Sequence, residues 1–542
     1  MSELDVRTEL ALLLDVGSAW AKAGVIGRVR GRWRLVAHAA QPTSWGSAEL
    51  RRTLVRQLAA VGDRRLADRF DDLLADANRI ECHTARQSGR LAIVAVSREL
   101  SGAAARRAAE AAGWEVAEIV TLDDGRSLAE RLAVLQAAEA DAWLVGGGFD
   151  DSRSPRALEA AALVASSRPP GGAAVVWAGS RRLADEVAAL FEPGAVAAVD
   201  NPRPDARHED AGPLREHLQD LLRRTVSSED EAHLASIALP RAVAALAADG
   251  GLRVLAVDLG ARTAIRALAE PDGSVSSRLR ASGGLAGTAM VVGAATRVAR
   301  LAGDAGDESA VADLLQTLRA RPATLPQTAE DLAAMQAAAR VQVAAMMEDA
   351  PVGSVDLVIG AGRTIAAAPQ PAQAARILLD GVRPLGVTQL AIDAGAVLAP
   401  LGSLGDEELR EGLALLADDL LTPLGTSVVC RGGEVGHLAM RVTVHRPGWP
   451  TPAPIELRVG QLQVVTLARG QEAELLIEPG PGINLGTPRR SPRIQARGTG
   501  GAVGLILDAR GVPIALPRRG DDRRTVLAGW RDALARESEL LA

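Results

Sequence analysis

A pattern that occurs twice in this chain constrains its fold more than any other feature. Each copy is an apolar run that ends in Asp-x-Gly, followed by a turn and a second apolar run. The copies are ALLLDVGSAWAKAGVI at Ala11–Ile26 and LRVLAVDLGARTAIRALAEPDG at Leu252–Gly273. Aligning Asp258 with Asp15 also aligns the glycines that follow them. Apolar runs joined by a short Gly-containing turn are typical of tight β-hairpins, so the repeat predicts two related halves.

The residue types of the first hairpin predict a phosphate site. Gly17 lets the backbone approach a ligand closely, and backbone amides near Ser18 can point at phosphate oxygens. Lys22 supplies a positive point charge, and Asp15 is suited to hold Mg²⁺ through water. With the second hairpin included, the two halves are expected to face each other across one nucleotide.

The position of Lys22 strengthens this interpretation, because it is the one lysine among 61 basic residues. Arginine is a planar fork and lysine a compact charge on a flexible stem, so a tight polyphosphate site can require the lysine. The alternative is that a single lysine survived compositional drift and fell in the hairpin by chance.

A third element, Val355–Pro369, is an apolar strand that runs into Gly360-x-Gly362. Glycines directly after a strand allow a flat base or a ribose to approach the backbone closely. The element therefore predicts the nucleoside end of the same site.

The remaining chain predicts an α/β protein with a β-rich end. Gly31–Ala40 indicates a third strand after the first hairpin, and Leu50–Asn78 has helical spacing. Strands alternating with helices of ten to fifteen residues between Arg90 and Asp200 indicate an open parallel sheet. Within it, Gly146–Gly148 followed by Asp150 is either a ligand loop or a tight turn.

Short β-leaning runs dominate the chain from about Leu424 onward. They lie at Val428–Val444, Ile455–Val465, Glu472–Ile477, Val503–Asp508 and Ile514–Leu516, and a last helix is expected over Arg523–Leu541. The expected division is a first lobe at 1–90, a parallel α/β region at 91–200, a second lobe at 214–423 and a β-rich domain at 424–542.

Composition excludes several classes of protein. A net charge of −6 with aromatic residues at 2% gives no basic surface or stacking platform for nucleic acid. Cys82 and Cys430 are too few for a disulfide framework. The chain has neither a signal-peptide pattern nor an apolar run of about eighteen residues, so no membrane span is expected. Together these features favour a cytoplasmic protein.

Common catalytic motifs are absent from the sequence. Lys22 is followed by Ala23, which excludes a P-loop, and there is no HExxH or GxSxG pattern. Classical metalloprotease and serine hydrolase functions are therefore disfavoured.

The elements DVGSAWAK, VDLGART and VIGAG resemble, in that order, the two phosphate motifs and the adenosine motif of the actin, sugar kinase and Hsp70 superfamily. Within it, the chain resembles accessory protein L of adenosylcobalamin-dependent glutamate mutase, the MutL family unrelated to mismatch repair. This resemblance implies an actin-like (ribonuclease H-like) duplicated ATPase fold with an inserted open α/β region and a C-terminal β-rich domain. It also implies ATP and Mg²⁺ as ligands and a mutase subunit as partner.

The resemblance assigns roles to individual residues. Asp15 and Asp258 would flank Mg²⁺ and the attacking water, and Lys22 would neutralise the transferring phosphoryl group. The phosphates would contact Gly17, Ser18, Gly260 and Thr263, and the adenosine would contact Gly360 and Gly362.

The second phosphate turn departs from the family pattern Asp-x-Gly-Gly-Ala-Thr-Thr-Asp. Ala261 replaces a glycine at a position expected to need a positive φ, and Ile265 replaces the last acid. These changes predict that nucleotide binding persists while hydrolysis becomes slow or is lost.

Three functions follow from these features. The first is an ATP-binding, chaperone-like accessory protein of a cobalamin-dependent mutase, with Mg²⁺-dependent ATPase activity. The second is a non-catalytic scaffold that holds a nucleotide or none and binds a protein partner. The third is a small-molecule kinase with Asp123 or Asp150 as base, although each is more simply a turn or cap residue.

Overall fold

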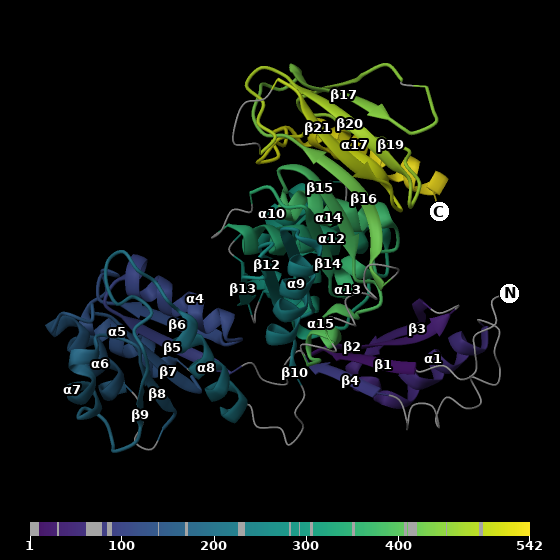
Figure 1. Ribbon diagram of the computed structural model, residues 1–542. Coiled ribbons are helices and arrows are strands. Elements are labelled where there is room, and N and C mark those ends of the chain that lie inside the picture. The colour runs from purple at the N-terminus through teal and green to yellow at the C-terminus, as the bar shows by residue number, and fades with distance from the viewer. Residues whose placement is uncertain are drawn as a thin grey trace. The chain divides into compact units, whose positions relative to one another are not determined.

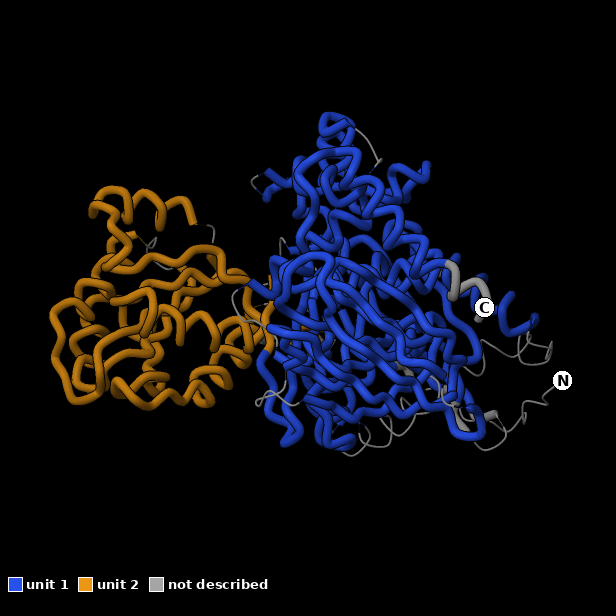
Figure 2. Tube along the Cα trace, turned by 90° about the horizontal axis from the view of Figure 1, so that it is seen from above, with its two compact units in different colours: residues 1–84, 238–276, 282–542 blue, residues 85–237, 277–281 orange. Residues whose placement is uncertain are grey.

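The computed structural model describes residues 10–29, 32–60, 78–83, 89–138, 140–167, 172–225, 233–280, 283–291, 293–303, 307–348, 353–405, 409, 420–450, 452–486 and 492–541. The chain forms two compact units (Figure 2). Unit 1 comprises residues 1–84, 238–276 and 282–542, and unit 2 comprises residues 85–237 and 277–281.

The first half of unit 1 begins with the predicted meander of antiparallel strands. Its elements are β1 (Leu10–Val16), β2 (Trp20–Val29), β3 (Arg32–Pro42), η1 (Thr43–Trp45), α1 (Ser47–Ala60) and β4 (Asn78–His83). β4 lies parallel to β1, and leucines of α1 cover one face of this sheet. The helix predicted over Leu50–Asn78 is described only as far as Ala60, and residues 61–77 lie outside the described part.

The second half of unit 1 repeats this arrangement. Its strands are β11 (Val254–Leu259), β12 (Ala264–Ala269), β13 (Val275–Arg280), β14 (Leu357–Ala361) and β15 (Gly386–Ile392). In both halves the third, second, first and fourth strands are neighbours in that order, and the fourth is parallel to the first. Because this is the ribonuclease H-like arrangement and it occurs twice, the predicted duplicated actin-like fold is confirmed (Figure 1).

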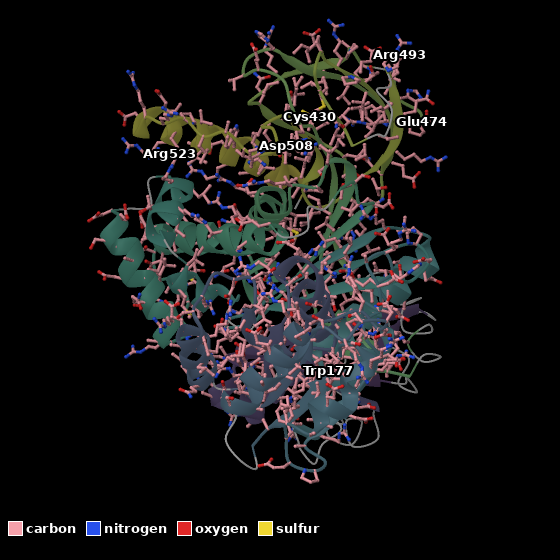
Figure 3. The ribbon with its side chains drawn as sticks, turned by 90° about the vertical axis from the view of Figure 1, so that its left-hand side faces the viewer. Trp177, Cys430, Glu474, Arg493, Asp508 and Arg523 are labelled. Carbon is pink, nitrogen blue, oxygen red and sulfur yellow. The ribbon has the colours of Figure 1, made fainter. Side chains whose placement is uncertain are left out.

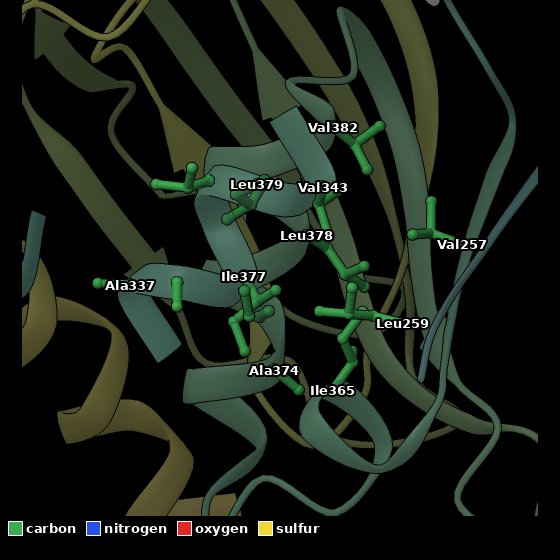
Figure 4. Packing of buried hydrophobic residues seen from close by; sticks show 14 of the residues in the cluster. Val257, Leu259, Ala337, Val343, Ile365, Ala374, Ile377, Leu378, Leu379 and Val382 are labelled. Atoms are coloured by element: carbon green, nitrogen blue, oxygen red, sulfur yellow. The ribbon is translucent and has the colours of Figure 1, made fainter. Parts of the chain in front are cut away.

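Helices cover the second sheet and form the main core of unit 1. They are η4 (Leu285–Met290), α10 (Ala294–Ala302), α11 (Glu308–Ala320), α12 (Ala329–Met347), α13 (Arg363–Ala366) and α14 (Pro371–Val382). Two further helices are α9 (Ala235–Gly250), which precedes β11, and α15 (Leu398–Gly402), which contacts β1 and β4 of the first half. Every residue of β11 is buried, as expected for a strand covered on both faces. Figure 4 shows Leu259 of β11 among Ile365 of α13 and Leu378 of α14.

The C-terminal part is β-rich, as predicted, and three of its strands extend the second sheet. β16 (Thr422–Val429), β22 (Gly504–Asp508) and β19 (Leu462–Val465) continue that sheet beyond β15. A separate antiparallel sheet contains β18 (Ile455–Arg458), β17 (Leu438–His445), β20 (Glu472–Pro479) and β21 (Ile494–Thr499), and α17 (Gly520–Leu541) follows. Figure 3 shows Glu474 and Arg493 at the surface of this sheet.

The strand predicted at Ile514–Leu516 is wrong, because these residues form a turn and irregular backbone. Pro513 and Pro517 flank the segment and lack the N–H group that a strand donates to its neighbour. An apolar run is therefore not sufficient for a strand at this position.

Unit 2 is the predicted open parallel sheet. Its strands are β5 (Arg90–Ala95), β6 (Glu115–Thr121), β7 (Ala142–Gly146), β8 (Ala174–Trp177) and β9 (Val196–Ala198), in the order β6-β5-β7-β8-β9. Its other elements are η2 (Arg98–Gly102), α4 (Ala103–Ala111), α5 (Leu128–Ala137), α6 (Pro155–Ser167), η3 (Arg181–Leu183), α7 (Ala184–Ala188), α8 (Gly212–Thr225) and β10 (His233–Leu234). No helix in the described ranges is both long and apolar enough to cross a membrane.

Candidate functional site

The two hairpins of unit 1 bring the predicted charged residues together. Asp15 on β1 lies directly opposite Lys22 on β2, and Lys22 Nζ donates a hydrogen bond to Asp15 Oδ2 at 2.6 Å. Both side chains are largely buried, with 16% of Lys22 and 6% of Asp15 exposed. Asp258 holds the position in β11 that Asp15 holds in β1, but it lies opposite Ile265 rather than a lysine. The second hairpin therefore has an equivalent aspartate but no lysine opposite it.

One oxygen of each aspartate is buried without a partner. Oδ1 of Asp15 and Oδ1 of Asp258 accept no hydrogen bond from any described residue. A buried carboxylate oxygen without a partner is costly, so these two atoms indicate a place for a cation or its water ligands.

The donor set fits Mg²⁺ that arrives with a phosphate ligand. Among the described residues, no three carboxylate, histidine or cysteine groups lie close enough to hold a metal ion. Mg²⁺ commonly takes one or two carboxylates and completes its shell with water and substrate phosphates. Asp15 and Asp258 supply that number of ligands, and a nucleotide would supply the rest.

A third buried acid, Asp393, belongs to the same cluster and was missed by sequence reasoning. It follows β15, and its carboxylate accepts hydrogen bonds from the backbone amides of Val397 at 2.9 Å and Leu398 at 3.0 Å. It thereby satisfies two backbone amides at the start of α15 that have no partner within the helix. Below, the Lys22 cluster denotes Asp15, Lys22, Asp258 and Asp393. The sequence signal was Ile392-Asp393-Ala394-Gly395, an Asp and Gly after a strand as in both hairpins.

Burial and mutual charge shift the protonation of the cluster. Burial raises the pKa of Asp258, Lys22 lowers it, and the charges of Asp15 and Asp393 raise it, with a result of about 6. Burial lowers the pKa of Lys22, but attraction by the three carboxylates outweighs burial and the pKa is raised. Lys22 therefore stays charged at neutral pH, while Asp258 titrates slightly below neutrality.

The turns of the two hairpins have the same geometry. The amide of Gly17 donates to the carbonyl of Trp20 at 2.9 Å, and the amide of Gly260 donates to the carbonyl of Thr263 at 2.9 Å. The two residues after each glycine, Ser18-Ala19 and Ala261-Arg262, donate no backbone hydrogen bond within the described part of the chain. Successive free amides at a turn form a concavity suited to anions.

The expectation that Ala261 needs a left-handed backbone is wrong. The non-glycine residues with positive φ in the described ranges are Arg383 and Ala396. The turn at Ala261 therefore accommodates a Cβ, and the substitution of the family's glycine does not by itself distort the second phosphate turn.

The carbonyl groups of the second turn are held by a segment that sequence reasoning also missed. The amides of Gly284, Leu285 and Ala286 donate to the carbonyls of Arg262, Gly260 and Ala261 at 2.8, 3.1 and 2.8 Å. A Cβ on Gly284 would lie 2.4 Å from the carbonyl carbon of Arg262. The signal in the sequence was the glycine pair that follows β13.

The two glycines of the third motif occupy different surroundings. Gly362 has φ of 80°, and a Cβ there would lie 2.2 Å from the carbonyl oxygen of Leu259 and 2.6 Å from Asp258 Oδ1. A Cβ on Gly360 would lie 2.6 Å from a methyl group of Ile365. Gly362 thus lies against the acid of the second hairpin, whereas Gly360 permits close packing beneath it.

A pocket of about 300 Å³ opens beside the Lys22 cluster. Both halves of unit 1 line it. Its polar and charged lining residues are Lys22, His38, Thr53, Gln57, Arg363 and Asp393, with Gly362 and Gly395 among the small residues. Ser18 is exposed, whereas Thr263, the last residue of the second turn, is buried.

The acids considered as kinase bases have structural partners in unit 2. The carboxylate of Asp123 accepts the backbone amide of Arg98 at 3.0 Å. That of Asp150 accepts Asn201 Nδ2 at 3.1 Å. The nearby Gly147 packs tightly, since a Cβ there would lie 2.4 Å from a methyl group of Val96. These bonds and this packing favour turn and packing roles for all three residues.

Comparison with solved structures returns proteins that overlap this chain only loosely. Nucleotide-free acetone carboxylase is 11% identical, covers 83% of this chain and 81% of its own, and has a TM-score of 0.30. Component A of (R)-2-hydroxyglutaryl-CoA dehydratase from Acidaminococcus fermentans is 10% identical, with coverage of 75% and 99% and a TM-score of 0.27. A carbohydrate kinase from Novosphingobium aromaticivorans is 14% identical, with coverage of 77% and 94% and a TM-score of 0.26. Overlaps this loose transfer no residue roles.

The family comparison is more specific. No curated protein matches the chain. The model of the MutL protein family matches residues 11–420, a span that includes both hairpins and the third motif. Because that span covers well over half of the 542 residues, the chain belongs to the MutL protein family, as its motifs predicted.

Proposed function

We propose that this protein binds ATP with Mg²⁺ between its two hairpins and hydrolyses it slowly, as an accessory protein of an adenosylcobalamin-dependent mutase. The observation that carries the proposal is the Lys22 cluster. It joins two equivalent acids with unpaired buried oxygens to one lysine, beside a pocket of about 300 Å³. Membership of the MutL family supports a mutase subunit as the partner.

Each residue of the site has a proposed task. Lys22 neutralises charge on the phosphoryl group, and the turns at Gly17-Ser18 and Gly260-Thr263 hold phosphates with backbone amides. Asp15 and Asp258 would hold Mg²⁺ with their carboxylates and would orient the attacking water. Mg²⁺, when bound, neutralises phosphate charge. Gly362, supported by Gly360, admits the adenosine end.

Slow hydrolysis follows from the residue opposite Asp258. Ile265 is buried and apolar, so the second hairpin has no further acid at this position to assist the attacking water. Asp15 and Asp258 remain to activate the attacking water. Loss of a general base lowers a reaction rate by about 10²- to 10⁴-fold. We therefore expect slow ATP hydrolysis, which is suited to timing a conformational change and is too slow for a metabolic reaction.

Phosphate release, measured with and without a glutamate mutase subunit, tests this proposal. Wild-type protein is expected to release phosphate from MgATP slowly, and Asp15→Ala and Lys22→Ala are expected to abolish release. Reactivation of an inactivated mutase should depend on the same residues. Turnover that is unchanged in both variants would contradict the proposed site.

A non-catalytic scaffold is the second candidate, favoured by Ile265 and by the ion pair that already satisfies Lys22 without a ligand. A scaffold of this kind predicts that Lys22→Ala leaves mutase binding unchanged. Mutase binding that requires both MgATP and Lys22 would instead support the accessory ATPase.

The raised pKa of Asp258 predicts a pH dependence for MgATP binding. Metal ligation requires the carboxylate, so affinity should be about tenfold weaker at pH 5 than at pH 7.5. The folded state holds this proton more tightly than the unfolded chain does. Stability from this group is therefore present in acid and is lost as pH rises from about 4 to about 6.

Calorimetric titrations across this pH range measure the effect. Asp258→Asn is the control, because it retains the titration of the nucleotide's own terminal phosphate and removes that of the side chain. An identical pH profile in both proteins would show that Asp258 does not contribute.

A further inference from the structure

Arg363 is the first residue of α13, and its guanidinium stacks on the ring of Trp20 in the first hairpin. Its guanidinium carbon lies 3.8 Å from the centroid of the Trp20 ring. Trp20 is the first residue of β2 and lies two positions before Lys22, so the two side chains share a face of the strand. The stack places a second cation beside the first phosphate turn.

The charge of Arg363 is not balanced by an acid. Its side chain makes no ion pair or hydrogen bond with any described residue, and it contacts Trp20 through its guanidinium. It is also partly buried, and this burial lowers its pKa. The five N–H donors of this guanidinium have no acceptor in the described protein, so they are free for water or for a ligand. A ligand anion would also balance the charge of the partly desolvated group, which water does not do.

The geometry of the stack favours an anion over a base as that ligand. A guanidinium binds aromatic groups through its faces and anions through its N–H edge. The indole of Trp20 already covers one face, and it holds the plane of the group in place. The edge remains available for bidentate contact with phosphate oxygens.

The charge balance of the site points the same way. The Lys22 cluster has three carboxylates against one ammonium, so even with Mg²⁺ bound it offers no net positive charge to a polyphosphate. Arg363 and Lys22 line the same pocket. One cation comes from each half of unit 1, so an anion held by both would link the halves.

We propose that Arg363 is a phosphate-binding residue of this site, acting with Lys22 on the polyphosphate chain of the nucleotide, and that Trp20 positions it. The inference rests on the proposed nucleotide site. Arg363 follows the Gly360-x-Gly362 motif, which the family pattern assigns to the adenosine end. The inference adds that the second half of unit 1 contributes a cation to the phosphates from this position.

Three probes separate phosphate contact from base contact: MgATP, adenosine, and tripolyphosphate used as a competitor of MgATP. Arg363→Gln should weaken MgATP binding and tripolyphosphate competition by about 10- to 100-fold, as for loss of a charged hydrogen-bond pair. Adenosine affinity should stay unchanged. Arg363→Lys should recover part of the loss, because it restores the charge without the fork. The exposed Arg319→Gln on α11 is the matched control.

Trp20 variants test the positioning role. Trp20→Phe should retain most of the MgATP affinity because a ring remains, whereas Trp20→Leu should lose several-fold with adenosine affinity unchanged. Thermal unfolding of each variant shows whether it is folded.

Two results would overturn the inference. One is MgATP binding by Arg363→Gln at the wild-type affinity. The other is a loss of adenosine affinity with tripolyphosphate competition unchanged, which would make Arg363 a base contact. Failure of the wild-type protein to bind MgATP would overturn the proposed function itself, and the two failures are thus distinguishable.

Discussion

Replacing Asp258 with Asn is expected to lower the single-turnover rate of MgATP hydrolysis by about 10²- to 10⁴-fold. It should also weaken MgATP binding at neutral pH by about tenfold, as protonation of Asp258 does, so the rate is measured at saturating MgATP. Asn has the size of Asp but cannot accept a proton or attract a cation with full charge. Oδ1 of Asp258 is a buried oxygen without a partner in the described structure, so it is placed to contact a ligand or its water. Single-turnover phosphate release measures the chemical step apart from product release.

The matched control is Asp272→Asn in the turn between β12 and β13. Asp272 is exposed and lies one turn further along the chain than the hairpin that holds Asp258, and its carboxylate accepts the backbone amide of Ser274. It should leave turnover unchanged. Wild-type turnover in Asp258→Asn would remove Asp258 from the mechanism and leave Asp15 as the remaining candidate acid.

Replacing Asp380 with Asn is expected to destabilise unit 1 by about 3–5 kcal/mol, the cost of breaking a buried ion pair from one side. Asp380 on α14 accepts Arg340 Nη1 at 3.0 Å and Arg510 Nη1 at 2.7 Å, and Arg376 Nε lies 3.6 Å away. Arg510 is fully buried and also pairs with Asp508. Removing the charge of Asp380 leaves Arg340 and Arg376 without their acid, while Arg510 keeps Asp508.

This network attaches the C-terminal part to the helices of the second half. Arg510 follows β22, and its guanidinium lies 5.1 Å from the ring centroid of Trp530 on α17. Burial raises the pKa of Asp380, but the surrounding arginines outweigh burial and hold it well below its usual range. The stabilisation is therefore present at neutral pH and is lost only as pH falls through that low value.

Urea denaturation measures the change in the free energy of unfolding. Hydrogen exchange of the backbone amides in α14 and β22 then shows whether the loss of stability is local to the network. The control is Glu456→Gln, which breaks the exposed pair of Glu456 with Arg441 at 2.8 Å. An exposed pair contributes about 0–1 kcal/mol. Equal decreases in the free energy of unfolding of the two variants would show that the Asp380 network stabilises the protein no more than an exposed ion pair does.

The hairpins were predictable because their signals are local. Alternating apolar residues, an acid and a glycine fix the register within about ten residues of sequence, and the Asp15–Lys22 pairing follows from it. The repeat then predicted the second hairpin and its acid, Asp258. That Ile265 lies opposite Asp258, where the first hairpin has its lysine, is shown by the strand pairing. The duplicated fold was accessible for the same reason.

The rest of the site was not predictable because each of its residues lies outside the repeated hairpin motif and far from the others in the sequence. Asp393 and Arg363 come to the Lys22 cluster through the pairing of β14 and β15, which no local pattern encodes. Likewise, composition indicated that the C-terminal part is β-rich, but not that β16 and β22 continue the second sheet. Long-range strand pairing depends on packing that a single sequence does not reveal.

Calorimetric titration of MgATP into the full chain at neutral pH tests the central claim most directly, with Lys22→Ala measured beside the wild type. The account predicts saturable binding at one site, weakened at least tenfold in Lys22→Ala because the buried ammonium is the main cation of the first hairpin. Absence of binding at millimolar MgATP, or equal binding by both proteins, would contradict it.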